Sequence, residues 1–66
     1  MTVVVNGDRT PIPEGASVAA LVARLTEAER GVAVALNGEV VPRSAWADTG
    51  LADGDRVEVL TAAQGG

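Results

Sequence analysis

The 66-residue sequence contains no cysteine, no histidine, no phenylalanine and no tyrosine. Without cysteine or histidine, the chain has no thiol nucleophile, no imidazole general base and no Cys/His zinc site. Neither a disulfide nor such a zinc site supplements its core, although domains this small often need one. Nine acidic residues against five basic ones give a net charge of −4. That balance disfavours binding to nucleic-acid phosphates and to anionic membranes.

Long hydrophobic runs are also missing. No apolar stretch approaches the roughly 20 residues of a membrane helix, and Thr2 leads into a strand-like run instead of a signal peptide. We therefore expect a cytoplasmic protein. All five basic residues are arginines, and the abundance of Ala, Val, Gly and Arg hints at a GC-rich bacterial genome. The hydrophobic content of 47% is normal for a folded chain, so we expect one small domain.

Two Asn-Gly pairs mark tight turns between β-branched segments. These segments predict strands over residues 2–6, 8–12, 32–36, 39–41 and 56–62. Asn6-Gly7 and Asn37-Gly38 are typical of type I′ hairpin turns, because both residue types tolerate positive φ. Pro11 places its strand at the edge of a sheet, since proline cannot donate to the hydrogen-bond ladder.

One amphipathic helix is expected between the first hairpin and the later strands. Ser17 is typical of an N-cap, and the apolar stripe that follows predicts a helix from Val18 to about Thr26, with Gly31 as the latest stop. Such a helix would be about 14 Å long and marginal alone, so it needs a sheet to pack on. The expected core comprises Val3, Val5, Val18, Leu21, Val22, Leu25, Val34, Leu36, Val57 and Val59.

The order of these elements predicts the fold class. A crossover helix after a hairpin allows the last strand to return parallel to the first. We therefore expect an α+β, β-grasp (ubiquitin-like) fold, with a mixed sheet of four to five strands packed on one helix. The domain would cover residues 1–62, and residues 63–66 would form a flexible tail.

Most polar residues have ordinary structural interpretations. Asp53 and Asp55 flank a glycine, as acids do in tight turns. Residues 44–48 suggest one helical turn in which Trp46 covers an end of the core, although it could instead be a ligand platform. Arg43 beside it could bind an anion, but exposed arginines are usually only solvated. The sequence shows no Ser/His/Asp arrangement and no phosphate-binding glycine loop, so we do not expect an enzyme.

The two glycines at the end of the sequence allow a specific chemistry. Four extended residues after the last strand reach about 13 Å, far enough to enter the active site of another protein. Glycine has no Cβ, so Gly65 and Gly66 can thread a narrow channel and leave the terminal carbonyl open to attack. Once activated as an acyl-adenylate, the Gly66 carboxylate could carry sulfide. The plain alternative is a frayed end with two incidental glycines.

Three segments carry a resemblance to a known family. GVAVALNGEVVPRSAW (residues 31–46), LADGDRVEVLTA (residues 51–62) and the final Gly65-Gly66 resemble the ThiS family, small β-grasp sulfur carriers of thiamine biosynthesis. The resemblance covers essentially the whole chain. It departs at Gln64, where many relatives have a small or apolar residue.

The resemblance implies that the chain is a substrate of other enzymes. A ThiF-type adenylyltransferase would use ATP to adenylate Gly66, and a donor such as a cysteine desulfurase would convert the adenylate to a thiocarboxylate. A ThiG-type thiazole synthase would then take the sulfur. Gln64 and Gly65 would lie in the partner's active site. The chain itself would bind no cofactor and no metal.

A partner-binding surface is expected on the open face of the sheet. If the first and last strands pair in parallel, Val4, Leu60 and Ala62 share the side away from the helix. Two other functions remain open. One is sulfur carriage in another pathway, as by the small subunit of molybdopterin synthase. The other is a noncovalent β-grasp interaction module whose tail is inert.

Overall fold

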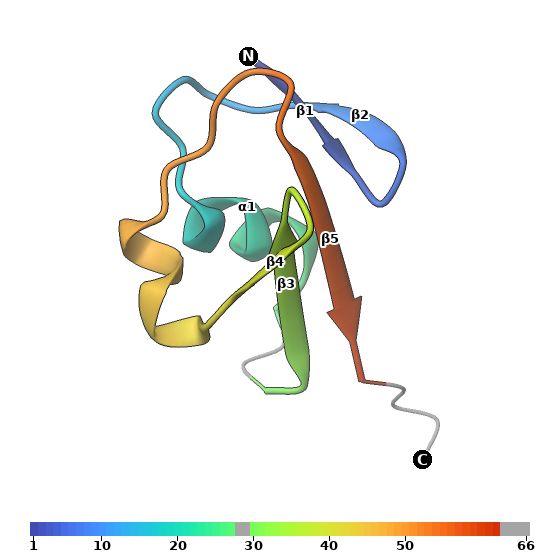
Figure 1. The fold of residues 1–66 in the computed structure, drawn as a ribbon, viewed down its shortest axis with the longest axis vertical. Helices are drawn as coiled ribbons and strands as arrows, with labels where there is room; N and C mark the ends of the chain where they lie inside the picture. The colour runs from blue at the N-terminus through green and yellow to red at the C-terminus, as the bar shows by residue number, and fades with distance from the viewer. Residues whose placement is uncertain (28–29, 63–66) are drawn as a thin grey trace.

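Every expected strand and helix is present, with ends within one residue of those expected. The computed structural model describes residues 1–27 and 30–62, so the tail expected at residues 63–66 lies outside the described part. In chain order the elements are β1 (Thr2–Val5), β2 (Asp8–Pro11), α1 (Val18–Leu25), β3 (Val32–Leu36), β4 (Glu39–Val41), the 3₁₀ helix η1 (Arg43–Asp48) and β5 (Arg56–Thr61) (Figure 1).

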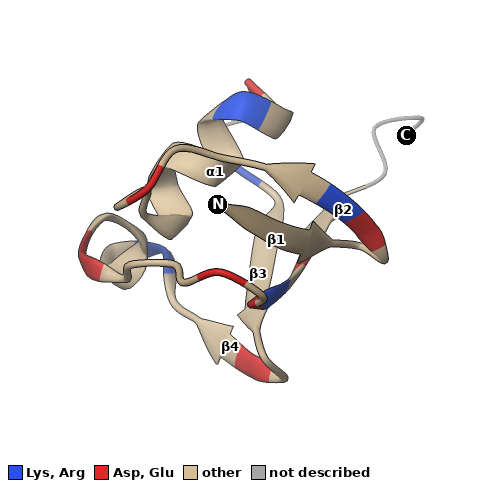
Figure 2. Cartoon of the chain, turned by 90° about the horizontal axis from the view of Figure 1, so that it is seen from above, with Lys and Arg blue, Asp and Glu red and all other residues tan. Residues whose placement is uncertain are grey.

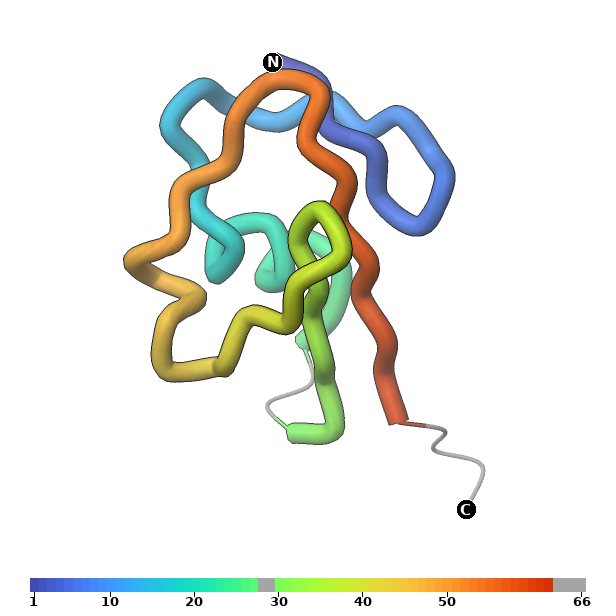
Figure 3. The backbone as a smooth tube through the Cα atoms, viewed as in Figure 1, coloured from blue at the N-terminus to red at the C-terminus, as the bar shows by residue number. Residues whose placement is uncertain are grey.

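The strands form one five-stranded sheet in the order β2-β1-β5-β3-β4. β1 and β5 pair in parallel, and the other neighbours are antiparallel. The last strand therefore runs through the middle of the sheet, between the two hairpins, as the backbone trace in Figure 3 shows. The mixed sheet with one α-helix confirms the predicted β-grasp fold. Pro11 lies in the edge strand β2, where its missing N–H leaves no ladder bond unmade.

Both Asn-Gly turns have the predicted backbone conformation. Asn6 and Asn37 each have φ of 50°, and the glycines that follow have φ of 87° and 88°. Positive φ at both central positions is the mark of a type I′ turn, whose twist matches that of the flanking strands. The turns connect β1 to β2 and β3 to β4.

Helix α1 begins at the predicted N-cap. The Ser17 Oγ accepts a hydrogen bond from the Ala20 N–H at 3.1 Å. The helix ends at Leu25, and the backbone N–H of the C-cap Thr26 donates to the Val22 carbonyl at 3.0 Å. Gly31 therefore does not end the helix. It precedes β3, where its carbonyl accepts a bond from the Ala62 N–H at 2.6 Å.

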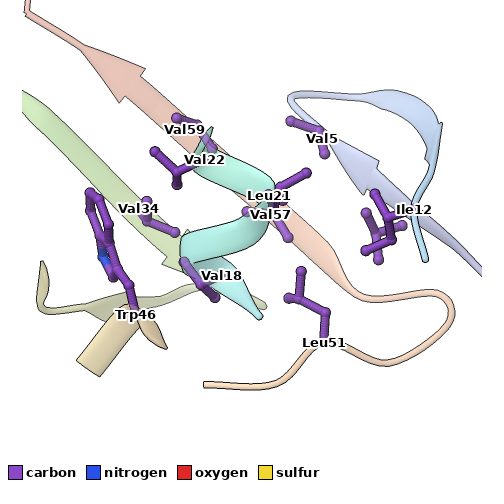
Figure 4. Close-up of a cluster of buried hydrophobic side chains, with 11 residues drawn as sticks. Val5, Ile12, Val18, Leu21, Val22, Val34, Trp46, Leu51, Val57 and Val59 are labelled. Atoms are coloured by element: carbon purple, nitrogen blue, oxygen red, sulfur yellow. The ribbon is translucent and has the colours of Figure 1, made fainter. Parts of the chain in front are cut away.

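The core lies between α1 and one face of the sheet, as Figure 4 shows. Its buried residues are Val3, Val5, Ile12, Val18, Leu21, Val22, Val34, Trp46, Leu51, Val57 and Val59. The expectation that Leu25 belongs to this core is wrong, because 45% of its surface is exposed. Leu25 ends the helix at a hollow of about 350 Å³, which separates part of its side chain from the sheet residues Val59 and Thr61 that also line the hollow. Leu36 packs at the core margin, only partly buried.

Helix η1 closes one end of the core, as expected for Trp46. The indole is buried, and its Nε1–H donates to the Val41 carbonyl at 2.9 Å. The Arg43 guanidinium carbon lies 5.6 Å from the centre of the ring, within cation–π range. A buried indole with its N–H bonded internally is a core residue and not a ligand platform.

The acidic pair also has the structural role expected of it. Asp53 Oδ1 accepts from the Thr2 N–H at 2.8 Å, and Asp55 Oδ2 accepts from the Ala52 N–H at 2.8 Å. These bonds stabilise the turn before β5. The acidic residues are spread over the hairpins and loops and not gathered in one place (Figure 2). None of the described helices is long and apolar enough to cross a membrane.

Candidate functional site

The last strand determines where the end of the chain leaves the fold. β5 pairs with β3 along its whole length, from Val57 opposite Leu36 to Thr61 opposite Val32. It pairs with β1 only at its start, where Val4 lies opposite Arg56 and Val5 opposite Val57. The residues after β5 therefore continue from the middle of the sheet. The expected site residues Gln64, Gly65 and Gly66 lie outside the described residues.

Side chains of β5 alternate between the core and the open face of the sheet. Val57 and Val59 are buried, whereas Glu58 and Leu60 are exposed, with 69% of the Leu60 surface accessible. Val40 of the edge strand β4 is 79% exposed. In the register of the sheet, Ala33 lies opposite Leu60, and Ala35 lies opposite both Glu58 and Val40.

These residues form an apolar surface close to the end of β5. We call Ala33, Ala35, Val40 and Leu60 the open-face patch. Together with Asn6, Val34 and Glu58 they line a shallow hollow of about 200 Å³. Large exposed aliphatic side chains grouped in this way are typical of a protein-binding surface.

Of the three residues expected to form the interface, the structure places Val4 apart from Leu60, whereas Ala62 follows Leu60 by two residues. The parallel pairing of β1 and β5 is as expected, and Val4 lies opposite Arg56, on the same face as Leu60. However, Val4 is four β5 positions away from Leu60, which is about 13 Å along a strand. Ala62 is exposed and lies beside Gly31. The apolar residue directly opposite Leu60 is Ala33 of β3. Val40 of β4 lies opposite Ala35 and lines the same hollow as Leu60, which the sequence analysis missed because it depends on the register of β4 on β3.

A second feature that sequence reasoning missed is the role of the two turn asparagines. The Asn6 Oδ1 accepts from the Val59 N–H at 2.9 Å, and its Nδ2–H donates to the Val59 carbonyl at 3.0 Å. The Asn37 Oδ1 accepts from the Arg56 N–H at 2.9 Å. Each asparagine thus forms its own hairpin turn and also bonds to β5. The bonded residue of β5 is 53 residues after Asn6 and 19 residues after Asn37.

The described residues provide a central strand, β5, whose end lies next to an apolar patch. Among residues 1–27 and 30–62, no three His, Cys, Asp or Glu side chains are grouped to hold a metal ion. By architecture this is a β-grasp protein whose last strand, β5, lies in the middle of the sheet. Comparison with known proteins identifies its family.

Residues 3–66 match the model of the ThiS family. The chain is 30% identical over 66 residues to the sulfur carrier protein ThiS of Escherichia coli K12, and the match covers both chains completely. It is 36% identical over 66 residues to a thiazole synthase of Paramagnetospirillum magneticum, but it spans only 20% of that longer protein.

Solved structures agree with this match. The crystal structure of the thiamine biosynthesis protein ThiS of Geobacter metallireducens superposes with a TM-score of 0.81 at 39% identity, with both chains fully covered. A solution structure of a thiamine biosynthesis protein from the same organism has a TM-score of 0.84 at 39% identity, covering all of this chain and 88% of the other. The chain therefore belongs to the ThiS family, the sulfur carriers of thiamine biosynthesis. This decides between the two sulfur pathways considered from the sequence, in favour of thiamine.

Proposed function

We propose that the chain carries sulfur as a thiocarboxylate on Gly66. The Gly66 carboxylate attacks the α-phosphate of ATP, which releases pyrophosphate and leaves an acyl-adenylate. Sulfide, or its equivalent from a persulfide donor and a reductant, then displaces AMP. A cysteine desulfurase is the class of enzyme that supplies such a persulfide. Transfer of the sulfur to an acceptor and addition of water return the carboxylate.

The observation that carries this proposal is the path of β5. The strand is held on both sides at its start and ends at Thr61, five residues before Gly66 in the sequence. The chain has no cysteine, so sulfur cannot be carried on a thiol. The family match continues to residue 66, and the match to the Escherichia coli sulfur carrier is end to end. An activated carboxylate at the end of the chain is the remaining group suited to bond sulfur.

The proposed sulfur acceptor is a ThiG-type thiazole synthase. A curated thiazole synthase contains a segment similar to this whole chain, so one polypeptide joins the two units there. The other proposed partner is a ThiF-type adenylyltransferase, which binds and uses the ATP. The chain is then a protein substrate of these enzymes, and it holds no cofactor of its own.

We further propose that the open-face patch docks on the adenylyltransferase. Leu60 lies one residue before the end of β5, so a partner that covers Leu60 and Val40 is also close to the residues that follow. Gln64 and Gly65 would then extend into the partner's active site. Val4 would contact only the margin of such an interface, and Ala62 would lie at its entrance.

The proposal is tested by ATP–pyrophosphate exchange with the cognate adenylyltransferase. We compare the native chain, a chain without Gly66 and a chain with a short C-terminal tag. Both altered chains should lose exchange, because activation needs a free carboxylate on a sterically open residue. Their melting temperatures should match that of the native chain, because the buried core of the described residues is built between Val3 and Val59.

The matched control carries the same tag at Met1, which lies at the opposite end of the molecule from the end of β5 (Figure 1). It should retain exchange. Equal exchange by all four chains would contradict the proposal and favour a noncovalent interaction module. The intact mass of protein isolated from its native cell gives a second test, because the carrier form replaces one oxygen by sulfur.

A further inference from the structure

The backbone ladder between β1 and β5 ends earlier than β5 does. Its last backbone bond runs from the Asn6 N–H to the Val57 carbonyl at 2.9 Å. At Asn6 the chain turns into β2, so no further β1 residue is available. The next β5 residue whose backbone faces β1 is Val59. Its N–H and its carbonyl are both bonded to the Asn6 side chain, at 2.9 and 3.0 Å.

The Asn6 amide therefore takes the place of one more residue of β1. A carboxamide presents one acceptor and a donor side by side, which is the pattern that a strand backbone offers to its neighbour. Beyond Val59, no bond in the described part of the chain joins β5 to the β1–β2 hairpin. On the other side, β5 remains bonded as far as Ala62, whose N–H donates to the Gly31 carbonyl.

Among the described residues, the end of β5 is thus bonded asymmetrically, and Asn6 makes the last hydrogen bonds on the β1 side of that strand. Five residues, 62–66, would span about 16 Å when extended in a partner's channel. The direction in which the end of β5 is held therefore affects how readily those residues enter the channel.

We propose that Asn6 is a positioning residue for sulfur loading. It orients the end of β5, so that the residues that follow point toward the active site of the adenylyltransferase when the two proteins meet. This inference rests on the proposed function. Loss of the Asn6 amide should leave the chemistry unchanged once the end of the chain is seated, because the partner's channel then holds it. The loss instead weakens binding to the adenylyltransferase, because the end of β5 must then be ordered as the complex forms.

The test compares Asn6→Gly with Asn37→Gly. Both residues occupy the same position of a type I′ turn at φ of 50°, and glycine adopts that conformation without strain. Both side chains accept a backbone N–H of β5, but Asn37 does so at Arg56, the opposite end of the strand. The pair therefore separates a general effect on the sheet from an effect at the end of the chain.

In ATP–pyrophosphate exchange, Asn6→Gly should raise the KM for the carrier about tenfold with kcat unchanged, as expected for two lost hydrogen bonds. Asn37→Gly should change KM by less than about twofold even where it lowers the melting temperature. Hydrogen exchange of the Val59 amide should accelerate only in Asn6→Gly. Asn6→Asp should also raise KM. It keeps an acceptor for that amide but loses the donor to the Val59 carbonyl.

The role of Asn6 is contradicted if Asn6→Gly and Asn37→Gly have equal KM values, or if kcat falls in place of a rise in KM. If Asn6→Gly does not fold, a native KM for Asn6→Asp contradicts the proposal in its place. Failure of the native chain to support exchange would instead contradict the proposed function, which distinguishes the two outcomes.

Discussion

Leu21 and Leu25 lie on the same apolar stripe of α1, one turn apart, yet their surroundings differ. Leu21 is 1% exposed and packs between the sheet and the loops that carry Ile12 and Leu51. Leu25, at 45% exposure, ends the helix where β1 no longer flanks β5. The helical period alone assigns both residues to the core. It shows which side of the helix a residue faces, but not how far the sheet extends opposite that side.

Truncation of these two leucines should therefore have unequal effects. Leu21→Ala should lower the free energy of unfolding by about 2–5 kcal/mol, because it opens a cavity in a closed core. That loss approaches the whole stability of a domain this small. Leu25→Ala should cost less than about 1 kcal/mol, as for most exposed positions. Urea denaturation of the three chains measures both values, and equal losses would contradict the burial assigned here.

Asn6 and Asn37 show a second difference between sequence and structure at the residue scale. The Asn-Gly pattern correctly predicts two type I′ turns. Because the turns already account for both asparagines, nothing in the sequence indicates their hydrogen bonds with Val59 and Arg56. Those bonds depend on which strand lies beside each turn.

The element that organises the molecule is β5. It bonds to β3 on one side and to β1 and the Asn6 amide on the other, and its two faces differ. Val57 and Val59 complete the core, while Leu60 belongs to the open-face patch. One strand thus supports the fold and carries the proposed docking surface.

Leu60→Asp should separate those two roles. A carboxylate in the open-face patch would oppose an apolar partner, so binding to the adenylyltransferase should weaken by at least about tenfold, equivalent to about 1.4 kcal/mol. The melting temperature should change little, because Leu60 is exposed. The control is Leu25→Asp, the same change at the exposed leucine of α1. Titration calorimetry measures both, and unfolding of Leu60→Asp would place Leu60 in the core.

The contact between β5 and the start of β3 gives another prediction. Gly31 has φ of +71°, and a Cβ there would lie 2.9 Å from the Ala62 Cβ. Gly31→Ala should therefore lower the free energy of unfolding by about 1–2 kcal/mol, because the added methyl meets both strain and a close contact.

Gly50 provides the comparison for this substitution. A Cβ at Gly50 would meet no atom within 4 Å, and its φ lies outside the left-handed region. Gly50→Ala should be neutral or stabilising by up to about 1 kcal/mol, since alanine restricts the unfolded chain. Thermal denaturation compares the two variants. A neutral Gly31→Ala would mean that Ala62 does not lie where the structure places it.

At the scale of the whole molecule, the fold was predictable because its local signals agree. The Asn-Gly turns, the capped apolar stripe and the β-branched segments each define an element by nearby residues. The crossover helix then allows a parallel return of the last strand. The burial of Ile12 and Leu51 was not predictable in this way. Both lie in loops, where no period distinguishes an inward side chain from an outward one.

The sequence by itself determined the elements, the mixed sheet, the absence of a thiol or imidazole, and the resemblance that led to the ThiS family. All of these follow from residues close together in the chain or from composition. Only the tertiary structure decided that Val40 joins Leu60, that Val4 lies apart from it, and that Asn6 holds Val59. The reason is that each of these depends on the register between strands distant in sequence. Register is set by the packing of the whole core, because a shift of one residue would turn every side chain to the other face.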